Sequence, residues 1–122
     1  MAHKLIKIIY ILATFLIINE LTSLGDPLQF IDLSSLLIVV IPTSLAGLVG
    51  WITSKYLAIC CSFYTSIFSG FLGVVIGLIQ TFSNSNGEPV VVHVGISVAF
   101  LPLFYGLAIG LFLLPFYIIG RK

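Results

Sequence analysis

The chain has 122 residues, of which 60% are hydrophobic and only 7% are charged, with a formal net charge of +1. A soluble domain has about 25% charged residues, so this composition excludes a water-soluble fold and predicts one domain that lies within a lipid bilayer. The sequence has no basic cluster or nucleic-acid motif, and nucleic acid is therefore not an expected partner.

The first membrane crossing is predicted over residues 5–21. Lys4 and Lys7 precede an uncharged apolar run at residues 8–18. Because a span needs about 20 residues, we expect the lysine side chains to extend to the membrane interface. This start resembles a signal peptide, but no convincing small-x-small cleavage site follows the run, so we expect an uncleaved helix.

The second crossing is predicted over residues 33–52, after a loop with the turn signal Gly25-Asp26-Pro27. Asp32 precedes this segment, and its carboxylate suits a helix N-terminus, where backbone N–H groups lack partners. Pro42 lies inside the segment and predicts a kink.

The third and fourth crossings are predicted over residues 58–82 and 90–119. A short connection that contains Lys55 precedes the third crossing, and a polar, turn-rich loop at residues 81–89 follows it. The fourth segment is longer than one untilted crossing requires and contains Pro102 and Pro115. We therefore expect it to kink or to extend beyond the bilayer.

Small residues recur at a spacing of four in the last two crossings. Residues four apart share one face of a helix, and in lipid a face of small residues lets another helix approach closely. The residues predicted to serve this helix packing are Ser66, Ser69, Gly70, Gly73, Gly77, Gly106 and Gly110.

Basic and acidic residues fall on opposite sides of the four predicted crossings. One side carries Lys4, Lys7, Lys55, Arg121 and Lys122, and the other carries Glu20, Asp26, Asp32 and Glu88. Basic residues favour the cytoplasmic side. The predicted fold is therefore an all-α integral membrane protein with four transmembrane helices and both termini in the cytoplasm.

Side chains for catalysis or metal binding are not grouped in this sequence. It has no nucleophile–base pair, phosphate loop or metal-ligand spacing, and the adjacent Cys60 and Cys61 have no His or Asp nearby. His93 is expected at the interface rather than in a proton relay. We therefore expect neither an enzyme nor a cofactor, and an ion that crosses would use backbone groups, hydroxyls or a partner's carboxylate.

Three phrases of the sequence, in order, resemble the MotA/TolQ/ExbB proton-channel family, and specifically its flagellar stator branch. At residues 30–40, an aromatic residue is followed by Ile-Asp and then Ser-Leu-x-Ile-Val, with Thr43 beyond it. Residues 70–80 resemble the Gly-x-x-Gly-Thr-x-x-Gly-Leu-Ile of the family's third crossing. Residues 96–115 parallel the fourth crossing, with Tyr105-Gly106, Ala108 and Pro115 in the family's order.

The resemblance implies a ring formed by copies of the chain in the bacterial inner membrane, and the expected ring is a pentamer. Such a ring surrounds a single-pass, MotB-like partner whose intramembrane Asp binds the travelling ion. The third and fourth crossings would face the ring axis, which makes Val74, Leu103, Pro102 and Tyr105 the candidate axis-facing residues.

The sequence also departs from the family pattern. Val74 and Leu103 stand where the family has threonines whose hydroxyls help to solvate the ion, Ile67 replaces a proline, and residues 53–57 leave no room for the stator's cytoplasmic domain. Two alternatives to an ion-driven subunit therefore stay open. One is a non-conducting structural or assembly protein with the same ring, and the other is a small stand-alone pore.

Overall fold

The structure is a computed structural model that describes residues 1–25 and 27–120, and within these ranges every regular element is a helix. The elements are α1 (Ala2–Ser23), a 3₁₀ helix η1 (Pro27–Phe30), α2 (Leu33–Trp51), α3 (Lys55–Asn84), α4 (Pro89–Ala99) and α5 (Leu101–Gly120). They form two compact units, Met1–Ile31 and Asp32–Lys122. Asp26, Arg121 and Lys122, which entered the prediction of membrane orientation, lie outside the described residues.

Four helical stretches are long and apolar enough to cross a membrane, namely Ala2–Thr22, Leu33–Trp51, Lys55–Asn84 and Pro89–Gly120. The prediction of an all-α protein with four transmembrane helices is therefore confirmed. The side on which the termini lie, and the assignment of the chain to one domain, stay predictions.

The first unit consists of α1 and the short helix η1. We predicted the first crossing over residues 5–21, and α1 extends it at both ends to Ala2–Ser23. Near the C-terminal end of α1, the Thr22 hydroxyl donates to the Asn19 carbonyl at 3.0 Å and the Ser23 hydroxyl donates to the Glu20 carbonyl at 2.9 Å. These bonds add side-chain donors to backbone carbonyls in the last turns of the helix.

The second unit begins with the predicted cap of α2. The Asp32 carboxylate accepts a hydrogen bond from the Ser35 backbone N–H at 3.2 Å, which confirms Asp32 as the N-cap. The helix continues through Pro42, which cannot donate a backbone hydrogen bond. The hydroxyl of the next residue, Thr43, donates to the Val39 carbonyl at 2.6 Å.

The bounds of α3 exceed the predicted 58–82 at both ends. The helix starts at Lys55 because the Ser54 hydroxyl caps it, accepting the Leu57 backbone N–H at 3.1 Å. At the other end it continues to Asn84, so part of the predicted loop is helical. The turn that follows contains Asn86 (φ 50°) and Gly87 (φ 80°), a left-handed conformation that asparagine and glycine tolerate best.

The predicted fourth crossing is two helices, because the chain breaks at Phe100 between α4 and α5. Pro102 has no N–H with which to bond the Val98 carbonyl four residues earlier. The Phe100 backbone N–H donates to that carbonyl instead. Pro115, the other proline predicted to kink this segment, lies inside α5 without dividing it.

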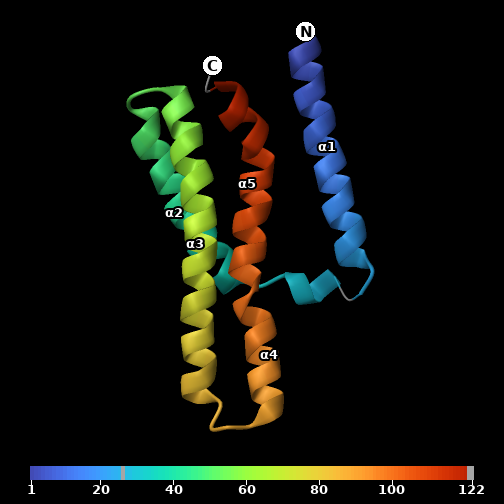
Figure 1. Cartoon of the computed structure of the whole chain (residues 1–122), viewed down its shortest axis with the longest axis vertical. Helices are drawn as coiled ribbons and strands as arrows, with labels where there is room; N and C mark the ends of the chain where they lie inside the picture. The colour runs from blue at the N-terminus through green and yellow to red at the C-terminus, as the bar shows by residue number, and fades with distance from the viewer. Residues whose placement is uncertain (26, 121–122) are drawn as a thin grey trace. The chain divides into compact units, whose positions relative to one another are not determined.

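Helix α3 is the central element of the second unit. It packs against α2 and runs along both α4 and α5, which follow one another beside it (Figure 1). Most of the buried residues are small, although the Phe63 ring of α3 stacks on the Tyr117 ring of α5 with centroids 4.7 Å apart. The buried hydrophobic residues are Val39, Ala58, Val74, Ala99 and Leu101.

Candidate functional site

The small-residue face of α3 packs against α4 and α5 of the same chain. A Cβ atom added to Gly70 would lie 3.0 Å from the Pro102 carbonyl oxygen and 3.1 Å from Leu103 Cα, and one added to Gly73 would collide with the Pro102 ring. At Gly77, an added Cβ would lie 2.8 Å from the Ala99 Cβ. The glycines therefore let α3 approach the break between α4 and α5.

The other predicted packing residues continue this contact along α5. Gly106 and Gly110 are buried, and a Cβ on Gly106 would collide with the Ser66 carbonyl oxygen. Ser66 is fully buried, and its hydroxyl donates to the Phe63 carbonyl at 2.8 Å. Ser69 is also buried. The seven residues predicted to pack thus lie along contacts inside one chain, and their part in contacts between copies stays a prediction.

Of the four candidate axis-facing residues, Val74 lies on α3, and Pro102, Leu103 and Tyr105 lie on α5. Val74 is 8% exposed, Pro102 is buried, and Leu103 and Tyr105 are half-buried. Val74 therefore has little surface free outside its own chain. That these residues line a ring axis stays a prediction.

Tyr105 connects α5 to the start of α2. Its hydroxyl oxygen accepts a hydrogen bond from the Asp32 backbone N–H at 3.0 Å, although the two residues are 73 positions apart in the chain. The Asp32 side chain caps α2 at the same point, so this residue is held through both its backbone and its carboxylate.

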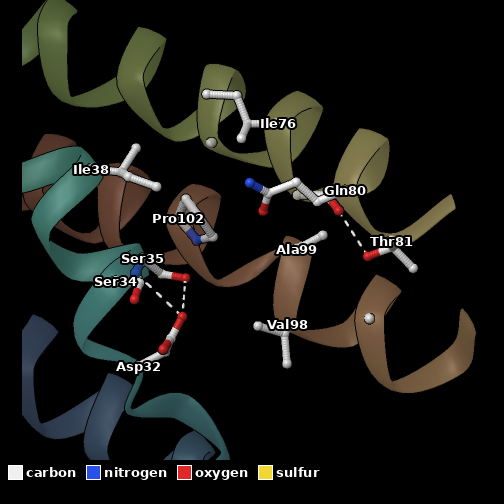
Figure 2. A pocket seen from close by; sticks show the side chains of 13 residues that line it. Asp32, Ser34, Ser35, Ile38, Ile76, Gln80, Thr81, Val98, Ala99 and Pro102 are labelled. Carbon is white, nitrogen blue, oxygen red and sulfur yellow. Dashed lines mark hydrogen bonds between the residues drawn. The ribbon is translucent and has the colours of Figure 1, made fainter. Parts of the chain in front are cut away.

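A cavity of about 340 Å³ lies beside this connection, between α2, α3 and the break between α4 and α5 (Figure 2). Gly73, Gly77, Ala99 and Pro102 form part of its wall. Its polar lining residues are Asp32, Ser34, Ser35, Gln80 and Thr81. Figure 2 shows Asp32 at the start of α2 and the Gln80 side chain reaching into the cavity from α3.

The chemistry of this cavity favours water and cations. Among the described residues that line it, Asp32 alone carries a charge, and that charge is negative. The Ser35 hydroxyl donates to the Asp32 carboxylate, and the Thr81 hydroxyl donates to the Gly77 carbonyl at 2.8 Å. Each hydroxyl oxygen keeps lone pairs that can accept hydrogen bonds or contact a cation.

A structural metal centre is not indicated. Among residues 1–25 and 27–120, no group of three or more His, Cys, Asp or Glu side chains could hold a metal ion.

The sequence-based prediction missed this cavity. It assigned Asp32 to a helix cap, placed Thr81 where the third crossing overlaps the following loop, and gave Gln80 no role. The position of these residues in the sequence was the available signal. Asp32 begins the second predicted crossing, and Gln80 ends the apolar part of the third. Both ends lie on the same side of the bilayer, so the two residues could have been expected near one another. The break at Phe100 brings the third wall of the cavity to them.

The model of one protein family matches this chain. It is described as the MotA/TolQ/ExbB proton channel family, and it matches residues 54–121. The match begins at the residue that caps α3 and includes all of α3, α4 and α5. Comparison with curated proteins and with solved structures finds no match.

Proposed function

The chain belongs to the MotA/TolQ/ExbB proton channel family, and on this premise we propose that it is a membrane subunit of a complex driven by an ion gradient. In this proposal, copies of the chain form a ring of five around a single-pass, MotB-like partner. The partner supplies the intramembrane Asp that binds the ion. The proposed activity is ion transport and includes no catalysed reaction.

The single observation that carries this proposal is the family match across α3, α4 and α5. The close contact of α3 with α4 and α5 supports it, because closely packed helices are a suitable wall for a ring. The described membrane-spanning part of the chain has no carboxylate at its centre, since Glu20 lies near the end of α1 and Asp32 caps an end of α2. A carboxylate from a partner would therefore complete an ion path.

The cavity at Asp32 supports an ion-conducting role over a purely structural one. A carboxylate, three hydroxyl groups and an amide line a volume of about 340 Å³ that reaches Gly73 and Pro102. These two residues are direct neighbours of Val74 and Leu103 in the chain. The cavity would lead water and cations toward the apolar positions where the family has threonines.

Purification of the chain with its native membrane partners tests the proposed assembly. We expect a single-pass protein with an intramembrane Asp to co-purify, and we expect images of the particle to show a ring with an occupied centre. A particle without such a protein would contradict the proposal. We place both termini in the cytoplasm and the complex in the bacterial inner membrane.

Restoring the family's hydroxyls tests the ion path. In proteoliposomes that contain the purified complex and a pH-sensitive dye, the double substitution Val74→Thr and Leu103→Thr should raise proton flux. At position 74 a threonine hydroxyl can bond a carbonyl of the preceding turn of α3. At position 103 the preceding turn is the break between α4 and α5, so the yield of folded complex is measured before the flux. Unchanged flux would show that these positions do not line the path.

A non-conducting ring protein is the second candidate, and the apolar side chains of Val74 and Leu103 favour it. This alternative predicts no flux above that of empty liposomes, from the wild type or from the double variant. A stand-alone pore would instead be toxic when the chain is expressed without any partner.

A further inference from the structure

A second, mostly apolar groove lies at the other end of the contact between α2 and α3. Its volume is about 420 Å³, and Leu48, Ile59 and Leu113 contribute to its apolar lining. Ser44 and Ser62 lie in the same groove. The groove therefore runs along helices that are long and apolar enough to cross the membrane, and it offers an apolar chain a place between them.

The groove has a basic residue where the two helices end. Lys55 is the first residue of α3, Trp51 is the last residue of α2, and both line the groove. The Lys55 ammonium lies 5.8 Å from the centre of the Trp51 ring, close enough for a cation–π contact. Among the described residues that line the groove, Lys55 alone carries a charge.

We propose that this groove binds one phospholipid with an anionic headgroup, its acyl chain in the groove and its phosphate beside Lys55. The arrangement matches the two ends of such a lipid, because the apolar part lies along the helices and the positive charge lies where they end. Tryptophan and lysine are typical of the level at which a crossing meets the headgroups. This inference does not depend on ion conduction or on the identity of a partner.

A charged lining residue distinguishes this groove from a neighbouring groove on the same pair of helices. The neighbour, of about 490 Å³, is lined by Ala46, Val49, Cys60, Cys61, Tyr64 and Thr65. It is similar in size and in apolar character, but none of these residues is a lysine or arginine. It therefore serves as an internal control for the contribution of Lys55.

The chain contains its own reporter, because Trp51 is its single tryptophan and 60% of its surface is exposed. Bromine atoms on an acyl chain quench tryptophan fluorescence on contact. The purified protein is reconstituted in bilayers that contain phosphatidylglycerol or phosphatidylcholine, each with the same brominated chain and at the same mole fraction. Quenching then compares an anionic with a zwitterionic headgroup on identical chains.

We expect phosphatidylglycerol to quench Trp51 at a lower mole fraction than phosphatidylcholine, with an apparent affinity about fivefold higher, as about 1 kcal/mol per basic residue near an anionic lipid implies. Lys55→Gln removes the charge at an exposed position and should abolish this preference. High salt should reduce it in the wild type, since counterions screen exposed charges.

Two further variants locate the acyl chain. Ser44→Phe places a bulky side chain in the Lys55 groove, whereas Ala46→Phe places the same side chain in the control groove two residues along α2. We expect Ser44→Phe to weaken quenching severalfold and Ala46→Phe to leave it unchanged.

Three results would overturn the proposal. Equal quenching of the wild type by the two lipids would exclude recognition of the headgroup by Lys55. Loss of quenching in Ala46→Phe but not in Ser44→Phe would place the lipid in the other groove. Absence of quenching by either lipid would mean that another copy of the chain or another protein covers the groove.

Discussion

Asp32 connects the start of α2 to α5 within the second unit. Its carboxylate caps α2 by accepting the Ser35 N–H, and its own backbone N–H donates to the Tyr105 hydroxyl on α5. The carboxylate also lines the polar cavity. A single side chain therefore stabilises a helix end and supplies the charge that would attract a cation.

Replacement of Tyr105 tests the connection between α2 and α5. Tyr105→Phe keeps the ring but leaves the part-buried Asp32 N–H without this acceptor, which should lower the free energy of unfolding in detergent by about 1 kcal/mol. Thermal or denaturant unfolding followed by circular dichroism measures the change. Tyr64→Phe is the control, because it removes a hydroxyl from an exposed pair with Tyr117. A larger loss for Tyr64→Phe than for Tyr105→Phe would contradict this view.

The charge of Asp32 can be separated from its capping role. Asn and Asp are about equally good N-cap residues, so Asp32→Asn should leave the thermal stability nearly unchanged. If the cavity conducts cations, loss of its negative charge should lower proton flux in proteoliposomes severalfold. Flux equal to that of the wild type would show that the cavity does not lie on the ion path.

At the scale of elements, the main contact is between α3 and the pair α4–α5. Proline at position 102 breaks the last crossing, and small residues let α3 lie against the break. Because apolar side chains gain little by leaving lipid for one another, close backbone contact supplies much of the attraction between these helices. The same small residues that would allow two chains to pack are thus used inside one chain.

Two alanine substitutions on α5 test this contact under matched conditions. Gly106→Ala places a methyl group against the Ser66 backbone, which cannot move away, and it should cost about 1–3 kcal/mol. Gly110→Ala meets a side-chain atom, Ile67 Cγ1, at 3.3 Å, which must shift by only a few tenths of an ångström, so this variant should be tolerated better. The yield of folded protein and the free energy of unfolding in detergent are compared between the two variants. Equal losses in both variants would argue against a tight contact at Gly106.

At the scale of the whole molecule, the distribution of charge predicts that the connection before α3 faces the cytoplasm and that the turn after α3 faces the opposite side. Thr53 lies in the connection before α3 and Asn86 lies in the turn after it, at opposite ends of the same helix. In a background that carries Cys60→Ser and Cys61→Ser, an impermeant maleimide should label Asn86→Cys in intact cells.

The matching variant Thr53→Cys should react only after the membrane is opened. Labelling of both variants in intact cells would mean that the chain inserts in two orientations, and the reverse pattern would invert the predicted topology.

The sequence by itself determined the fold class, the four crossings and the family. Each depends on a one-dimensional signal. Apolar length identifies a crossing, Asp32 marks the start of α2, and residues 70–80 carry the spacing that resembles the family. The helix ends were less predictable, since the cap at Ser54 and the extension of α3 to Asn84 depend on a few local hydrogen bonds and turn angles.

Only the tertiary structure decided which faces meet. The hydrogen bond between Asp32 and Tyr105 joins positions 73 residues apart, and no spacing along the chain encodes it. The cavity exists because the break at Phe100 and the glycines of α3 bring Pro102 close to α3, while α2 adds Asp32. Small residues predict that two helices can approach, but the partner helix follows from the path of the chain, which here places α4 and α5 against α3.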